Sequence, residues 1–328
     1  MVALITKYGQ GLGLGHIKRM KVLKTYLTEK EIDSEIFYLE NLNYHKNIKL
    51  AIIDAREVDK SLINELIKEK VPVISLDDTE TEKPSIISIL SLPFLETKGP
   101  KPNFQGKEFL ILDPEIQKTK KTGKEFDFLI TFGGEDPNNL TELFLNKFKE
   151  VIEDKKTAIL IGPLFKNREK IKKLAKELNI KVYENENIYS LIALSDTIIT
   201  SFGITTYESL ILGKHIILLN NSEYHHKLFL KSKLKRYGIK EIGFLENGKL
   251  IKNKPQINNK TIAKFSLNIN ENLERWANLI KLCLELENQI NFKTLYGAKA
   301  IARTKGKTIF LKNNQTIILP LKTIFYSL

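Results

Sequence analysis

The chain has 328 residues, which exceeds the usual size of one domain, so two domains are expected. Hydrophobic residues make up 42% of it, as in globular proteins, and no apolar run approaches the roughly 18 residues that a membrane-spanning helix needs. A single cysteine, Cys283, excludes an internal disulfide and a cysteine-rich metal site. Together with an N-terminus that lacks the features of a signal peptide, it favours a cytoplasmic location.

The formal net charge of +13 favours an anionic partner, which can be nucleic acid, acidic lipid or a phosphorylated small molecule. The lysines are spread along the chain, as is usual for solvated helix faces. The sequence contains neither a zinc-finger spacing nor an aromatic RNA-binding signature, so no nucleic-acid partner is expected.

The first half of the chain alternates strands and helices. Residues 50–54 form a continuous apolar run, typical of a strand that is buried on both faces of a parallel sheet. Residues 17–30 carry an apolar stripe at helical spacing, and residues 61–70 predict a second helix with Ser61 as its cap. Further strands are predicted at 2–6, 35–39, 73–76 and 86–92.

A Pro-, Gly- and Lys-rich segment at 96–107 and a lysine cluster at 118–124 indicate an exposed linker. The alternation then restarts, with strands predicted at 126–132, 157–161, 180–183, 197–200 and 215–219, and helices at 139–150, 169–178, 188–194 and 205–212. Two successive runs of this kind predict an α/β protein with two doubly wound, Rossmann-like sheets in tandem. Their ligands are expected beyond the carboxyl ends of the strands, in the cleft between two facing sheets.

The pattern changes after residue 260. Residues 270–289 predict an amphipathic helix that carries Leu273, Trp276 and Ile280. Residues 308–311 and 316–319 flank a polar turn and predict a β-hairpin. The predicted domains are therefore residues 1–115, residues 116–260, and an extension at 261–328 made of a helix and a β-hairpin, whose role the sequence does not show.

A glycine-rich loop, Gly11-Leu12-Gly13-Leu14-Gly15-His16, joins the first predicted strand to the first helix. Glycines allow close approach of a ligand and helix N-termini attract phosphate, so Gly13 and Gly15 are candidate phosphate contacts. The spacing departs from the dinucleotide fingerprint G-x-G-x-x-G. At the helix start, the helix dipole disfavours a cationic imidazole, which suits His16 to act as a general base. The alternative is a histidine that caps the helix or packs.

Charged residues are predicted at the same sheet edge as the glycine loop. Asp54 ends the third strand and Asp77-Asp78 end the fourth. Asp54 and Asp78 are candidates to orient the imidazole or bind sugar hydroxyls, although aspartates at strand ends commonly cap loops. Lys18 and Arg19 are candidates to bind phosphate or carboxylate, with two solvated cations as the alternative.

Two motifs in the second half repeat the strand–glycine–helix arrangement. Gly133 and Gly134 can admit a diphosphate or form a tight turn. In the segment 200–208, four residues before and within the first helical turn can hold a diphosphate: Ser201, Gly203, Thr205 and Thr206. Glu208 can accept hydrogen bonds from ribose hydroxyls, and helix capping is the alternative for this segment. His225-His226 has no third ligand at helical spacing, so it is interpreted as surface or cleft lining and no metal site is predicted. No cofactor is predicted either.

These motifs resemble a known family. The segments 13–19, 53–54, 75–78, 132–136 and 201–208 are similar to the UDP-2,4-diacetamido-2,4,6-trideoxy-β-L-altropyranose hydrolases of pseudaminic acid synthesis, which are related to the N-acetylglucosaminyltransferase of peptidoglycan synthesis. The resemblance covers roughly residues 1–245. It implies a GT-B fold, a nucleotide held mainly by the second domain, and metal-independent hydrolysis of a UDP-sugar with release of UDP. It also implies that His16 activates water and that the segment 201–208 forms the nucleotide site.

The sequence departs from the family pattern at Thr6-Lys7-Tyr8, at residues 110–115 and at Phe202. Two other functions therefore stay open besides the hydrolase. One is a GT-B glycosyltransferase, for which the basic surface and the helix at 270–289 would contact an anionic membrane that carries a lipid-linked acceptor. The other is a protein that binds a sugar nucleotide without turning it over.

Overall fold

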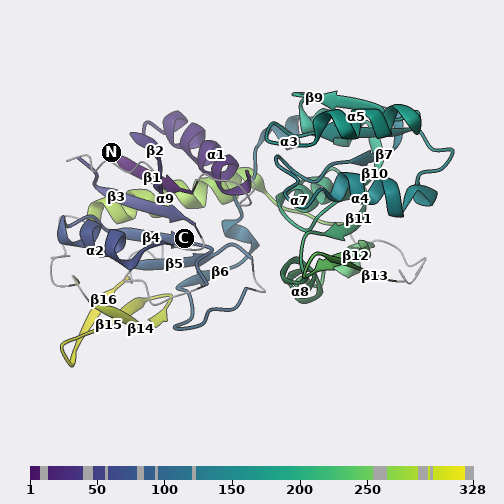
Figure 1. Ribbon diagram of the computed structural model, residues 1–328. Helices are drawn as coiled ribbons and strands as arrows, with labels where there is room; N and C mark the ends of the chain where they lie inside the picture. Colours follow the sequence, from purple (N-terminus) through teal and green to yellow (C-terminus); the bar gives the residue numbers. More distant parts are fainter. Residues whose placement is uncertain are drawn as a thin grey trace. The chain divides into compact units, whose positions relative to one another are not determined.

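The computed structural model describes residues 1–7, 14–39, 47–55, 58–79, 85–92, 95–119, 123–253, 264–286, 295 and 298–321. The chain divides into two compact units, each built on its own largely parallel sheet (Figure 1). The first unit comprises Met1–Tyr8, His16–Leu112 and Asn268–Leu328, and the second comprises Gly9–Gly15 and Asp113–Leu267. The predicted extension is thus no separate part, because its residues from Asn268 onward belong to the first unit.

The first unit contains a six-stranded parallel sheet in the order β2-β1-β3-β4-β5-β6. Its strands are β1 (Val2–Thr6), β2 (Ser34–Tyr38), β3 (Leu50–Asp54), β4 (Val73–Leu76), β5 (Ile87–Leu90) and β6 (Phe104–Gln105), and its helices in this part are α1 (Gly15–Glu29), α2 (Lys60–Lys68) and a 3-10 helix, η2 (Lys107–Phe109). Every residue of β1 and β3 is buried, as the apolar runs predicted. The strand order reverses between β1 and β3, so a ligand is expected at their carboxyl ends.

The second unit contains a seven-stranded sheet in the order β13-β12-β11-β10-β7-β8-β9, in which only the β12–β13 pair is antiparallel. Its strands are β7 (Phe126–Ile130), β8 (Thr157–Ile161), β9 (Lys181–Glu184), β10 (Ser195–Thr200), β11 (His215–Asn220), β12 (Lys240–Glu246) and β13 (Lys249–Lys252). Its helices are α3 (Glu115–Lys118), α4 (Leu140–Lys147), α5 (Arg168–Glu177), α6 (Ile188–Ala193), α7 (Ile204–Ile211) and α8 (Glu223–Ser232), with 3-10 helices η3 (Lys149–Val151) and η4 (Leu234–Tyr237). Here the order reverses between β7 and β10.

The prediction of two Rossmann-like α/β sheets is therefore confirmed. In the second unit, the sequence left β12 and β13 unassigned, which complete one side of the sheet, and also α8. The start of α2 also differs from the prediction. Its cap is Asp59, whose carboxylate accepts a hydrogen bond from the Ser61 backbone N–H at 2.9 Å, so Ser61 lies inside the helix.

The predicted amphipathic helix is α9 (Ile269–Leu286), which belongs to the first unit (Figure 1). Its apolar side chains are buried there. Trp276 is fully buried and its indole N–H donates to the Phe109 carbonyl oxygen at 3.0 Å. Asn272 donates to the Leu110 carbonyl at 3.0 Å, and the Tyr26 hydroxyl donates to Glu274 at 2.7 Å. The apolar side chains Leu273, Trp276 and Ile280 are fully buried in protein, so they are not the part of this helix that would contact a membrane, and membrane contact by the protein stays a prediction.

A three-stranded antiparallel sheet ends the described chain, with β14 (Lys299–Thr304), β15 (Lys307–Lys312) and β16 (Gln315–Pro320). The predicted hairpin is confirmed as β15 and β16, joined by Asn313 and Asn314. Both asparagines have positive φ, 48° and 62°, the left-handed conformation that two-residue hairpin turns require. The prediction missed β14, which pairs with the other side of β15. No helix within the described ranges combines the length and apolar composition needed to cross a membrane.

Candidate functional site

In the first unit, His16 and Asp54 meet at the point where the strand order reverses. His16 lies in the first turn of α1, and Asp54 is the last residue of β3. The Nδ1 atom of His16 lies 2.7 Å from Oδ1 of Asp54. The Asp54 side chain is completely buried, whereas the imidazole is 17% exposed. A buried carboxylate thus holds an imidazole that ligands can reach.

The neighbouring groups decide which nitrogen of His16 carries the proton. Arg19 Nη2 also lies 3.0 Å from this Nδ1 atom. One ring nitrogen cannot accept a hydrogen bond from the guanidinium and donate one to the carboxylate at the same time. A carboxylate is an acceptor only, so a bond of 2.7 Å to Asp54 requires a proton on Nδ1. In the neutral imidazole, the lone pair then lies on Nε2, which is the form of a general base.

Arg19 completes the support of Asp54 and is not placed to bind phosphate as predicted. Its Nε and Nη2 atoms donate to the two oxygens of Asp54 at 3.0 and 2.7 Å, and Nη1 pairs with Asp77. Burial alone would lower the pKa of the guanidinium, but attraction to Asp54 and Asp77 outweighs it and raises that pKa. Burial would likewise raise the pKa of Asp54, but the Arg19 charge and the His16 imidazole lower it. Asp54 therefore stays ionised beside the imidazole.

The other site residues predicted in the first unit do not all join this network. Asp77, and not the predicted Asp78, joins this network, and its carboxylate also accepts from the backbone N–H of Ser91 at 2.7 Å. Asp78 is 2% exposed. Burial lowers the pKa of Arg303 on β14, and the charge of Asp78 partly offsets this effect. Gly15 is the first residue of α1 and Lys18 is half-buried. Gly13 lies outside the described residues.

In the second unit, two glycine-containing segments follow β7 and β10, where the strand order reverses. After β7, Gly133 has a φ of 82°, which favours glycine, and a Cβ on Gly162 would lie 2.5 Å from the Gly133 and Gly134 carbonyl oxygens. Asp136 then caps α4, with its carboxylate oxygens accepting from the backbone N–H groups of Leu140 and Thr141 at 2.7 and 2.8 Å. Gly133 and Gly134 therefore form a tight turn before a helix that is already capped.

The segment after β10 leads into α7, whose N-terminus has no such cap. Gly203 is the residue before the helix, and no side chain in the described structure caps it in the way Asp136 caps α4. Asn220, at the end of β11, fixes the approach to the helix by accepting from the Phe202 backbone N–H at 2.7 Å. Half-buried Ser201 and Thr205 flank this helix start. Exposed helix N–H groups and the positive end of the helix dipole can bind a diphosphate.

Thr206 and Glu208 lie inside the unit. The Thr206 hydroxyl accepts from the Gly203 N–H at 3.2 Å, and the residue is fully buried. Glu208 is also fully buried and accepts a hydrogen bond from the Tyr189 hydroxyl at 3.2 Å, while the same hydroxyl lies 3.3 Å from Asp113. Burial and both carboxylates raise the pKa of Tyr189. Both predicted nucleotide contacts therefore have structural partners within the unit.

The sequence missed a polar network behind the Ser201 loop. Glu241 on β12 accepts from Asn220 Nδ2 at 2.5 Å and from Asn253 Nδ2 at 2.8 Å, and it pairs with His226 Nδ1 at 2.7 Å. The His226 ring stacks on Phe244, with ring centroids 4.1 Å apart. The signal for this network was Glu241, a carboxylate directly before the apolar residues of β12, but β12 itself was not predicted.

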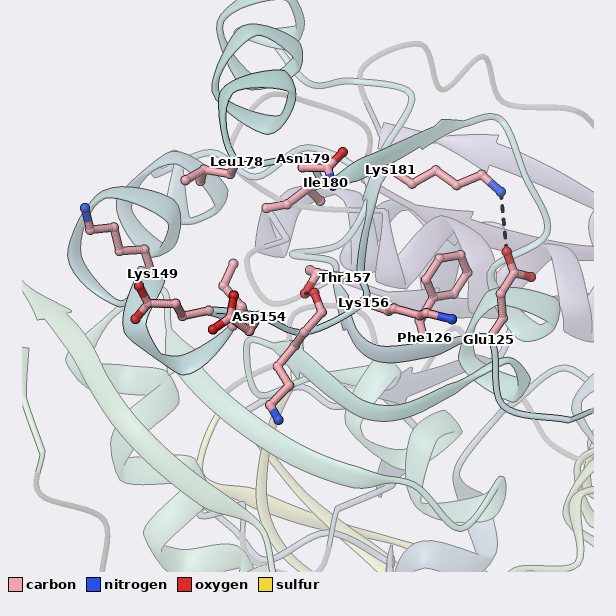
Figure 2. A pocket seen from close by; sticks show the side chains of 13 residues that line it. Glu125, Phe126, Lys149, Asp154, Lys156, Thr157, Leu178, Asn179, Ile180 and Lys181 are labelled. Atoms are coloured by element: carbon pink, nitrogen blue, oxygen red, sulfur yellow. Dashed lines mark hydrogen bonds and ion pairs between the residues drawn. The ribbon is translucent and has the colours of Figure 1, made fainter.

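A cavity of about 700 Å³ lies elsewhere in the second unit (Figure 2). Its lining includes Phe126, Thr157 and Lys181, the first residues of β7, β8 and β9. It is therefore at the amino ends of the strands, opposite the end where doubly wound sheets bind ligands. None of the predicted site residues lines it.

Two Rossmann-like sheets in one chain, with the helix α9 returned to the first unit, define an α/β protein of the GT-B class. No family model matches the chain. An uncharacterized protein of Methanocaldococcus jannaschii is 26% identical in an alignment of length 276 that covers 70% of this chain and 57% of that protein. The chain thus spans 57% of the length of this relative.

Several solved structures align with the chain at low sequence identity. They include UDP-GlcNAc 2-epimerase from Methanocaldococcus jannaschii (12% identity, 86% of this chain and 99% of that chain, TM-score 0.45), MurG from Acinetobacter baumannii (10%, 92% and 95%, 0.44) and the spinosyn rhamnosyltransferase SpnG complexed with thymidine diphosphate (9%, 90% and 95%, 0.49). At these TM-scores the likenesses assign no activity to this chain.

Proposed function

We propose that the protein hydrolyses a UDP-linked deoxy amino sugar at the anomeric carbon and releases UDP. The observation that carries the proposal is the 2.7 Å contact between His16 Nδ1 and the buried carboxylate of Asp54. This contact fixes the tautomer of a partly exposed imidazole and presents Nε2 as a base. Asp54 is then a positioning residue, and Arg19 with Asp77 keeps it in place.

In the proposed reaction, His16 Nε2 takes a proton from water while the water oxygen attacks the anomeric carbon. The bond between that carbon and the diphosphate oxygen breaks, and UDP leaves with the electron pair. A diphosphate is a stable anion, so its departure needs no strong general acid. The α7 N-terminus supports the diphosphate part of the proposal, because its N–H groups and helix dipole favour a phosphate there.

The choice of substrate rests on the sequence. The motif from Gly13 to Arg19 and the segment 201–208 resemble the hydrolases of pseudaminic acid synthesis, whose substrate is a UDP-linked diacetamido-trideoxy altrose. Burial of Glu208 limits this comparison, since its carboxylate faces Tyr189. We therefore leave the ribose contact out of the proposal and place the nucleotide on the α7 N-terminus alone.

The decisive experiment is an acceptor-free assay with a panel of UDP- and CMP-sugars that includes the altrose derivative, read by mass spectrometry. Hydrolysis predicts UDP and free sugar in equal amounts, and His16→Ala should abolish turnover with UDP affinity unchanged. Release that requires an added acceptor would overturn hydrolysis in favour of glycosyl transfer, in which His16 deprotonates the acceptor hydroxyl. Tight UDP binding with every sugar nucleotide left intact would overturn catalysis altogether.

A further inference from the structure

The C-terminal sheet β14–β16 has one face that packs on the first unit and one that does not. Arg303, Thr308, Phe310 and Leu319 are buried on the inner face. The Thr308 hydroxyl donates to the Ile86 carbonyl at 2.8 Å, and Asn103 Nδ2 donates to the Thr304 carbonyl at 2.8 Å. Arg303 donates to the Ser85 hydroxyl at 3.1 Å. These bonds fix the sheet to the unit and leave its outer face turned away.

The outer face is apolar at its centre. Ile309 pairs with Ile318 across β15 and β16, and both lie on the side opposite Phe310. Leu311 alternates onto the same side, and a bulge next to Ala302 adds Ile301. Ile318 is 57% exposed, Ile301 42% and Leu311 38%. Three of the seven exposed large apolar side chains among the described residues thus lie on three short strands.

Positive charge surrounds this apolar centre. Lys299 pairs with Leu311 and Lys307 pairs with Pro320, which places both lysines on the outer face, and both are exposed. Lys305 lies in the exposed turn between β14 and β15. From residue 288 to the last residue, the sequence holds seven basic residues and no acidic one.

We propose that the outer face of β14–β16 docks on the surface of an anionic phospholipid bilayer. The isoleucines and the leucine would enter the boundary between headgroups and acyl chains, and Lys299 and Lys307 would contact lipid phosphates. A lipid surface would contact both the apolar centre and the lysines around it, whereas a nucleic acid would contact the lysines alone. A second copy docked on the same face would bring lysines against lysines.

The test uses the full chain and vesicles of phosphatidylcholine with or without phosphatidylglycerol, and it measures the fraction that sediments with the vesicles. The wild type should bind only the anionic vesicles, and high salt should release it. Lys299→Gln with Lys307→Gln should weaken the partition coefficient about 25-fold, at about fivefold for each lysine. Ile318→Gln with Leu311→Gln should weaken it about tenfold or more.

Matched controls separate this face from general charge and hydrophobicity. Lys173→Gln with Lys176→Gln removes two exposed lysines from α5, and Leu230→Gln removes an apolar side chain that is 47% exposed on α8. These variants should bind vesicles as the wild type does. Equal loss in the controls would overturn the proposal, as would unchanged binding of the two sheet variants. Sedimentation of a stable dimer that Ile318→Gln dissociates, with no vesicle binding by the wild type, would also overturn it in favour of a second copy.

Discussion

His16 and Asp54 lie 38 positions apart in the sequence, yet their side chains meet at 2.7 Å. His16 lies in the first turn of the helix that follows β1, and Asp54 is the last residue of β3. Because β1 and β3 are neighbouring parallel strands, their carboxyl ends lie at the same edge of the sheet, and this brings the two side chains together. Asp54 has three polar contacts from His16 and Arg19, and its completely buried carboxylate cannot reorient toward water. The imidazole is therefore held in one orientation before any ligand arrives.

Asp54→Asn should lower kcat of the proposed reaction by about 10³-fold or more, because an amide can hold the wrong tautomer of His16. The Kd for UDP should not change. Asp77→Asn is the matched control, since it removes the other carboxylate of Arg19 but leaves the His16–Asp54 contact intact. We expect a much smaller loss of kcat from this control. Equal losses in the two variants would show that Asp54 acts only through stability.

The stability that Asp54 contributes should depend on pH. Its pKa in the folded protein is lowered from the usual 3.8, so its contribution is complete above about pH 4 and is lost as pH falls toward the folded-state value. In urea unfolding at neutral pH, the free energy of unfolding of Asp54→Asn should be about 3–5 kcal/mol lower than that of the wild type. The difference should narrow below about pH 4. A difference that stays constant down to pH 2 would contradict the lowered pKa.

Ile204→Pro should weaken UDP binding by about 1.5–3 kcal/mol, because it removes one N–H group from the proposed diphosphate site. Proline is well tolerated at the first position of a helix, and the extended Gly203 before it suits a following proline. Ile204→Ala retains the N–H and should bind UDP like the wild type. Lys60→Pro, at the first position of α2, should also leave the affinity unchanged. The affinities can be compared by titration calorimetry.

Gly162→Ala should destabilise the protein by about 1–3 kcal/mol, because its Cβ would meet the carbonyl oxygens of Gly133 and Gly134 at 2.5 Å. Those oxygens belong to backbone and cannot rotate away. Gly123→Ala is the control, since a Cβ there meets nothing within 4 Å, and it should change the free energy of unfolding by less than about 0.5 kcal/mol. Equal thermal stability of the two variants would contradict the close approach.

Trp276→Ala should cost about 3–5 kcal/mol of unfolding free energy, the usual range for a large aromatic removed from a core. The structure gives the reason, because Trp276 is fully buried, donates to Phe109 and packs edge-on against its ring at 6.1 Å. Lys281→Ala on the exposed side of α9 should change stability by less than about 0.5 kcal/mol. A small effect of Trp276→Ala in chemical unfolding would show that α9 is not part of the core.

The sequence determined the order of strands and helices along most of the chain, and it located the segments at the carboxyl ends of the strands. Apolar runs such as 50–54 and glycines before helices reflect local conformational preferences, so they suffice to predict the order of the elements and the loops between them. The hairpin at Asn313-Asn314 was predictable for the same reason, since its turn chemistry is local.

Only the tertiary structure decided which side chains meet. Periodicity places Asp54, Asp77 and Asp78 at one edge of a sheet, but it does not show that Asp77 pairs with Arg19. It also cannot show that α9 buries its apolar stripe, because an amphipathic helix faces protein or lipid with the same pattern. Strand order and burial settle these choices, since a side chain's role depends on partners that lie far away in the sequence.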